Sequence, residues 1–201
     1  WPTQQFGSVQ PGDIKYRDIN GDGYVNTYDK VAIGYTVVPE INYGFGVSLG
    51  FKGFDASVFF SGVAHVTRII TGNNLFGATA DIKYEGQIFA DVAEKRWTRQ
   101  NPDPNAEYPR LSLENVTNNQ QASTFWQKDM SFLRLKNAEF GYTLPKKMMQ
   151  KIGLSTTRVY VQGTNLFTFS KFKLWDPELA TANGSADPNI KSFSVGLNLN
   201  F

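Results

Sequence analysis

The segment Asn42–Gly62, "NYGFGVSLGFKGFDASVFFSG", decides the fold because large apolar residues alternate along it with small or polar ones. From Tyr43 to Phe51, every second residue is aromatic or aliphatic, and the residues between them are glycine or serine. Successive side chains of a β-strand point to opposite faces, so this period of two predicts a strand with one apolar face. The same alternation runs from Phe54 to Phe60 and predicts a second strand.

Only Lys52 and Gly53 separate these two strands. A two-residue hairpin turn would pair Phe51 with Phe54 and place both side chains on the same face, so the two apolar faces would merge. The glycines within the first strand lack the spacing of a phosphate-binding loop, and we therefore assign them to the strand.

Three later segments are also predicted strands, at residues 131–144, 158–169 and 192–201. The second is rich in β-branched and aromatic residues, but its pattern does not decide which residues share a face. Between the first two, "LPKKMMQKIG" (144–153) predicts a short amphipathic helical turn that begins at a proline. The connections alternate between short and long, the longest covering about residues 64–130. Strands of about 10 residues with this alternation are typical of an outer-membrane β-barrel, which has short periplasmic turns and long extracellular loops. A soluble β-sandwich, whose strands also alternate, is the alternative.

The composition excludes several classes of protein. The chain has 201 residues, 41% of them hydrophobic, which is enough for one substantial core. A net charge of +2 gives no reason to expect a nucleic-acid partner, and the absence of cysteine excludes disulfides and thiol chemistry. No run of about 18 apolar residues predicts a transmembrane helix. The chain opens at Trp1 without a signal peptide, and we expect it to be a piece of a longer protein.

A second motif, "DINGDGYVNTYD" (Asp18–Asp29), has the spacing of a calcium-binding loop. Oxygen ligands recur at alternate positions, a glycine stands at the sixth position, and a carboxylate closes the twelfth. The predicted Ca²⁺ ligands are Asp18, Asn20, Asp22, the Tyr24 carbonyl, Asn26 and Asp29. The loop resembles that of dockerin modules, although only one such loop is present and aspartate replaces the usual final glutamate. The alternative is an ordinary Asn-Gly/Asp-Gly turn without an ion.

No arrangement of residues predicts catalysis, so we do not expect an enzyme. His65, the only histidine, stands where a strand passes into a loop and has no triad or metal-hydrolase spacing around it. Four carboxylates fall near one face of a predicted loop helix that also carries Ile82, Ile88, Phe89 and Val92: Asp81, Glu85, Asp91 and Glu94. Aromatic residues in the loops could stack on sugars, but packing within the loops is the favoured role: Trp97, Tyr108, Trp126 and Trp175.

Several stretches together resemble the C-terminal end of SusC/RagA-type TonB-dependent outer-membrane transporters. These are "PGDIKYRDINGDGYVNTYDKVAIG", "YGFGVSLGFKGFDASVFFSG", "FLRLKNAEFGYTLPKKMMQKIGLSTTRVYVQGTNLFTFSKFKLWDPE" and the final "LNLNF". The resemblance implies an all-β, antiparallel fold, with five or so strands of a large transmembrane barrel and long extracellular loops. Such transporters have an N-terminal plug, take up glycans or peptides, pair with a SusD-like surface lipoprotein, and draw energy from the TonB complex.

On this reading, residues 1–41 are an extracellular loop in which calcium acts as a structural clip, and 42–201 are barrel strands with their loops. The rest of the same barrel would complete the protein in the outer membrane. We then expect one face of the strands to contact lipid, at Val47, Leu49, Val58, Phe140 and Leu197, and the other to face the lumen, at Ser48, Ser57, Glu139 and Asn198. The alternative function is a soluble calcium-binding β module of dockerin-like or adhesive type.

Overall fold

The computed structural model describes residues 1–77 and 87–201 of the chain. They form two compact units. One unit contains residues 35–66, 129–179 and 187–201; the other contains residues 1–34, 67–128 and 180–186, apart from 78–86. Each unit is described by itself below.

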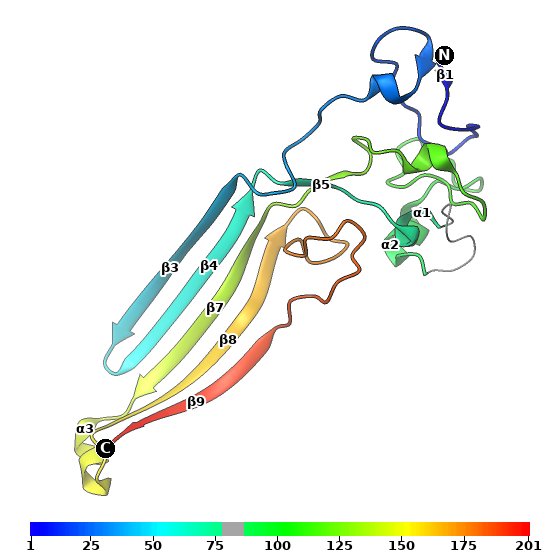
Figure 1. The fold of residues 1–201 in the computed structure, drawn as a ribbon. Helices are drawn as coiled ribbons and strands as arrows, with labels where there is room; N and C mark the ends of the chain where they lie inside the picture. The colour runs from blue at the N-terminus through cyan, green and yellow to red at the C-terminus, as the bar shows by residue number, and fades with distance from the viewer. Residues whose placement is uncertain (78–86) are drawn as a thin grey trace. The chain divides into compact units, whose positions relative to one another are not determined.

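The first unit is built on a five-stranded sheet with the order β3-β4-β7-β8-β9 (Figure 1). Every neighbouring pair is antiparallel, and each strand pairs with the next long strand along the chain. The strands are β3 (Ile41–Phe51), β4 (Phe54–Ala64), β7 (Phe132–Thr143), β8 (Thr156–Ser170) and β9 (Ser192–Asn200). The five predicted strands are therefore confirmed.

The register merges the apolar sides of the strands, as the hairpin at Lys52-Gly53 predicts. Phe51 pairs with Phe54, and the two turn residues have φ angles of 48° and 89°. Positive φ at both central positions is the type I′ conformation, whose twist matches that of the flanking strands. One row across the sheet shows the result, and we call the side that carries it the apolar face: Leu49, Ala56, Phe140, Val161 and Val195. The adjacent row defines the polar face: Ser48, Ser57, Glu139, Gln162 and Ser194.

An irregularity at Lys136 interrupts both ladders of β7. On its far side Leu135 pairs with Phe60 and Phe167, so apolar residues again share a row. On β8 the same step contains Asn165 with a φ of 53°. A bulge of this kind adds a residue without moving the following side chains to the wrong face.

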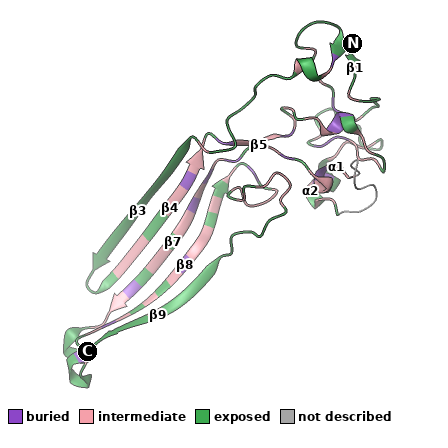
Figure 2. Ribbon diagram, viewed as in Figure 1, coloured by how far each residue is buried: buried purple, intermediate pink, exposed green. Residues whose placement is uncertain are grey.

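The apolar face is largely exposed within this unit. All residues of β3 and nearly all of β9 are exposed (Figure 2). Leu49 keeps 69% of its surface accessible, Val195 77% and Phe140 52%. Burial of such side chains contributes about 25 cal/mol per Å². This face therefore retains apolar surface that contact with another apolar phase would stabilise.

The connection between β7 and β8 is the predicted helical turn. Helix α3 (Lys146–Met149) follows Pro145 and continues into the 3₁₀ turn η3 (Gln150–Ile152). Gly153, with a φ of 79°, ends it in the left-handed conformation that favours glycine at a helix C-terminus.

The second unit has little regular structure and a small core. Its elements are β1 (Thr3–Gln4), which is parallel to β2 (Tyr24–Val25), with η1 (Thr27–Asp29), α1 (Asn73–Phe76), α2 (Ala90–Lys95) and η2 (Thr117–Gln120). Strand β5 (Thr67–Ile69) pairs with β6 (Gln127–Asp129), whose last residue belongs to the first unit. Trp126 is fully buried, and the rings of Phe76, Tyr108 and Phe125 surround it.

The two compact units do not correspond to a division of the chain at residue 41, because each unit contains several separate segments of the sequence. The described residues of the long connection that follows β4 cluster with the N-terminal residues instead of with the sheet. Whether residues 1–41 lie outside the cell stays a prediction. Of the predicted loop helix, Asp91, Val92 and Glu94 lie in α2, whereas Asp81, Ile82 and Glu85 fall outside the described residues. Among the described helices, none combines the length and the apolar character needed to cross a membrane.

Candidate functional site

The segment Asp18–Asp29 forms a compact loop held by its own polar side chains. The Asp18 carboxylate accepts hydrogen bonds from the N–H groups of Gly21 and Gly23, at 2.6 and 2.9 Å. Asp22 accepts one from the Tyr24 N–H at 2.8 Å. Gly21 and Gly23 have φ angles of 80° and 84°, and therefore the loop requires glycine at these positions.

Asp29 closes the loop. Its carboxylate accepts hydrogen bonds from the N–H groups of Ile19 and Asn26, both at 2.8 Å. These hydrogen bonds hold the pKa of Asp29 below its usual range, and the bond from the Asn26 N–H has the largest effect. Asn26 caps η1 in return by accepting a hydrogen bond from the Tyr28 N–H at 2.8 Å. The predicted twelve-residue unit is thus a folded unit with both ends tied together.

The chemistry of this loop suits calcium in donor type, since all predicted ligands are oxygens. The Asp18, Asp22 and Asp29 carboxylates are directed to backbone N–H groups, which leaves each with unused lone pairs. Across the described part of the chain, no three His, Asp or Glu side chains converge as a metal centre. Calcium binding by Asp18, Asn20, Asp22, Tyr24, Asn26 and Asp29 therefore stays a prediction.

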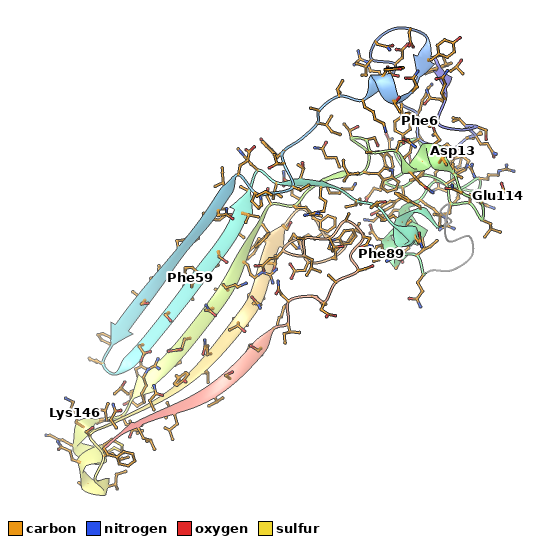
Figure 3. The ribbon with its side chains drawn as sticks, viewed as in Figure 1. Phe6, Asp13, Phe59, Phe89, Glu114 and Lys146 are labelled. Carbon is orange, nitrogen blue, oxygen red and sulfur yellow. The ribbon has the colours of Figure 1, made fainter. Side chains whose placement is uncertain are left out.

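The segment before this loop is fixed at Asp13 and Ile14 by two buried asparagines that the sequence analysis did not single out. Asn119 accepts a hydrogen bond from the Ile14 N–H at 2.9 Å, and Asn118 donates one to the Ile14 carbonyl at 2.7 Å. Asn119 also donates to Asp13 at 2.8 Å, and the Asp13 carboxylate, which has no exposed surface, pairs with Arg110 at 2.7 Å. Figure 3 labels Asp13 in this region. These contacts join residues about a hundred positions apart, so no local pattern indicates them.

The aromatic residues that the sequence analysis singled out in the loops pack against other residues of their own unit. The Trp126 indole N–H donates to the Asn119 carbonyl at 2.7 Å, and the Tyr108 hydroxyl donates to Asp91 at 2.8 Å. Trp97 lies against Gly12, where a Cβ would collide with its ring. In the first unit, the Trp175 ring packs edge-on against Phe172 at 4.7 Å. The packing role is the one these contacts support.

His65 contacts two side chains near the end of β4. Its ring stacks on Tyr35 with centroids 4.3 Å apart, and Nδ1 lies 3.3 Å from a Glu40 carboxylate oxygen. Its φ of 54° marks the point at which the chain leaves β4. These contacts brace the end of the strand.

The polar face of the sheet carries an ion-pair cluster at one end. Arg158 on β8 pairs with Asp55 on β4 and with Glu139 on β7, and its Nε donates to Asp55 at 3.0 Å. Gly141 lies beneath the guanidinium, where a Cβ would collide with it. Gly196 lies in the same way beneath the Tyr160 ring. Glycines on this face therefore make room for large side chains that reach across neighbouring strands.

A second cluster holds the connection between β8 and β9 against the sheet. Arg134 on β7, whose side chain is only 2% exposed, pairs with Asp176, and its Nε lies 3.3 Å from Glu178 without the alignment of a hydrogen bond. Lys136 pairs with the same Glu178 at 3.2 Å. Asp176 also accepts a hydrogen bond from the Glu178 N–H at 3.0 Å, which shapes the turn. We call residues 171–179 the acidic turn.

Known proteins with similar sequences are TonB-dependent receptors. No protein-family model matches the chain. TonB-dependent receptor P26 of Formosa agariphila is 34% identical over 94% of this chain, and TonB-dependent receptor P3 of the same organism is 29% identical over 97%. The chain spans about a fifth of the length of each, 20% in both cases.

Solved structures give the same result for the fold. The RagAB peptide transporter superposes on 89% of this chain with a TM-score of 0.67 and 25% identity, and the chain covers 19% of that protein's chain. The "closed-closed" state of the RagAB peptide importer covers 95% of this chain, again with a TM-score of 0.67. The antiparallel strands match the barrel region of that importer, and within this chain the sheet does not close. The chain spans about a fifth of the length of these relatives, and it belongs to the TonB-dependent receptors of the SusC/RagA type.

Proposed function

We propose that this chain forms part of the transmembrane barrel of an outer-membrane nutrient importer that takes up glycans or peptides. The observation that carries the proposal is the difference between the two faces of the sheet. One face presents exposed aliphatic and aromatic rows, and the other carries serines, glycines and the Arg158 cluster. A barrel in a membrane has this division, with an apolar band toward lipid and a polar lumen.

The dimensions of the strands agree with a bilayer. On β8 the apolar residues extend from Val159 to Phe169, about 33 Å at 3.3 Å per residue. A strand tilted by about 40° would then cross about 25 Å, which is the height of the outward apolar band in outer-membrane barrels. Aromatic side chains stand at both ends of this band, as Phe51, Phe54 and Tyr142 at one end and Phe167 and Phe169 at the other.

The family resemblance suggests the energy source and the partner protein of the importer. We propose that the TonB complex drives the importer through parts of the transporter that this chain, about a fifth of the relatives' length, does not include. We also propose that a SusD-like surface lipoprotein covers the extracellular mouth of the barrel. RagAB, the structural relative, is described as a peptide importer, which supports peptides as one substrate class. Glycans are the other class that the resemblance implies.

We also propose calcium as a structural brace of the loop Asp18–Asp29. A loop that already ties its ends through Asp29 needs little further ordering to bind an ion. Three carboxylates and an exposed position favour weak binding, about 10⁻⁴–10⁻³ M, as in extracellular modules. The ion would stiffen a loop and take no part in transport chemistry.

A soluble calcium-binding module agrees less well with the structure. The exposed apolar rows would face water, and both β3 and β9 would present open edges that favour aggregation.

The test uses the intact transporter with single cysteines at Val47 and Ser48. We expect a lipid-phase quencher to reach a label at position 47 and a water-soluble thiol reagent to react at position 48. Equal water access at the two positions would refute the barrel assignment. Uptake of fluorescent oligopeptides and oligosaccharides, with and without an intact TonB complex, would then identify the substrate class.

A further inference from the structure

The helical turn between β7 and β8 presents cations and apolar side chains on one small surface. Lys146, Lys147 and Lys151 are all exposed, and so are Met148 (54%) and Ile152 (66%). Figure 3 labels Lys146 on this turn, and Figure 1, in the same view, marks the C-terminus at the same end of the sheet. We call these five residues the lysine turn.

Charge is distributed unevenly between the two ends of the sheet. Residues 144–157 contain three lysines and no aspartate or glutamate, and the neighbouring hairpin turn adds Lys52. No ion pair joins the three lysines to a carboxylate among the described residues. Among the acidic residues of this unit, Glu40, Asp129, Asp176 and Glu178 lie toward the opposite end of the sheet. Asp55 and Glu139 lie nearer the turn, where both pair with Arg158. The small net charge of the chain therefore conceals a cationic end.

The lysine turn is a fixed surface. The Leu144 N–H donates to the Thr157 carbonyl at 2.9 Å, and the Leu154 N–H donates to the Met149 carbonyl at 3.0 Å. The Ser155 N–H joins the turn to β9 through the Asn200 carbonyl at 2.8 Å. Met149 is buried at 7% exposure, so the turn has an inner side, and the exposure of Met148 and Ile152 is a consequence of its fold.

The lysine turn also continues the apolar face. The last rows of that face before the turn contain Tyr142 and Val159, which pair with each other, and Leu199, which pairs with Thr157. Helix α3 contacts β8 directly. If the apolar face contacts lipid, the turn lies where the hydrocarbon ends and the headgroups begin.

We propose that the lysine turn binds the headgroups of anionic phospholipids in the leaflet at this end of the barrel. The three ammonium groups pair with phosphates, while Met148 and Ile152 enter the boundary of the acyl chains. Lysine suits this position because its aliphatic stem lies along apolar surface and its charge reaches the headgroups. A soluble partner protein would not need the continuity with the apolar face. The inference rests on the proposed barrel and adds a lipid preference to it.

The experiment compares two triple variants of the intact transporter in nanodiscs. Lys146→Gln/Lys147→Gln/Lys151→Gln removes the cationic turn. The matched control, Lys171→Gln/Lys173→Gln/Lys191→Gln, removes the same charge from exposed lysines of the other end. The measurement is the ratio of phosphatidylglycerol to phosphatidylcholine in the motionally restricted lipid, from spin-labelled lipids of both kinds.

We expect the parent and the control to prefer phosphatidylglycerol and the first variant to lose most of that preference. A lysine at an anionic surface contributes about fivefold to binding, so even partial engagement gives a measurable difference. An environment-sensitive label on a cysteine at Ile152 should also be quenched by brominated phosphatidylglycerol.

Two outcomes separate this inference from the proposed function. In the first outcome, a label at Val161 is quenched by brominated lipid, but a label at position 152 is not, or both triple variants keep the phosphatidylglycerol preference of the parent. The lysine turn then does not bind phospholipid, and the barrel assignment still stands. If neither label is quenched, the barrel assignment and the inference both fail.

Discussion

Arg134 is expected to be the residue that holds the acidic turn (171–179) against the sheet. Its side chain is 2% exposed, Asp176 is 14% exposed, and Glu178 is 36% exposed. Removal of one member of a buried ion pair leaves an uncompensated charge and costs about 3–5 kcal/mol. For Arg134→Met, we therefore expect the acidic turn to open far more often.

Lys136→Met provides the control. Lys136 lies on the same strand and pairs with the same Glu178, but 35% of its side chain is exposed. Pairs of this kind contribute about 0.2–1 kcal/mol. Each variant thus removes one cation from the same cluster, and the two removed side chains differ in how deeply they are buried.

Hydrogen exchange of the intact transporter, read by mass spectrometry on the peptide that covers 172–179, measures the opening. The Glu178 and Leu179 N–H groups report it directly, since both donate to Asp176 at 3.0 Å. At 1.36 kcal/mol per tenfold change, Arg134→Met should accelerate exchange about 100-fold or more, and Lys136→Met about fivefold at most. In Arg134→Met/Asp176→Asn, the amide oxygen can still cap the turn without a buried charge, and part of the protection should return. Equal acceleration in the two single variants would show that burial of Arg134 does not decide the stability of this turn.

The remaining predictions concern the faces, the calcium loop and its response to acid. Val161→Arg, on the apolar face, should destabilise the membrane-inserted barrel by about 2–4 kcal/mol, and Gln162→Arg much less; urea unfolding in vesicles compares them, and equal costs would contradict the assigned faces. Calorimetric titration should show weak calcium binding that Asp22→Ala abolishes, and identical heats for the two proteins would exclude this loop as the site. Because hydrogen bonds lower the folded-state pKa of Asp29, the ionised carboxylate stabilises its loop above the pKa of an unfolded aspartate, about 3.9, and this contribution disappears as the pH falls through the lower folded-state pKa. The amide chemical shift of Asn26 should follow that loss in the parent and stay unchanged over the same pH range in Asp29→Asn.

The sequence alone determined the strands and the two faces of those with clear alternation, because alternation is a local property of an extended backbone. Lys52-Gly53 fixed the first register for the same reason, since a two-residue turn leaves one way to pair Phe51 with Phe54. The facing of residues 158–169 was ambiguous in the sequence, and the pairing of β8 with its neighbours decided it. The spacing of Asp18–Asp29 predicted a calcium-binding loop, and this stays a prediction. The hydrogen bonds that tie the ends of this loop together all lie within its twelve residues. The lysine turn was recognisable as a helical turn from Pro145 onward, but its charge was hidden in a net charge of +2.

Only the tertiary structure decided which distant residues meet. Arg134 and Asp176 are 42 positions apart, and Asn118 and Ile14 are 104 apart, so neither pair leaves a periodic signal. The bulge at Lys136 is equally invisible, because it depends on how β4 and β8 align with β7. The clustering of the described residues of 67–128 with the N-terminal segment has the same origin. Local sequence sets which way a side chain points, whereas burial and pairing depend on elements that come together when the whole chain folds.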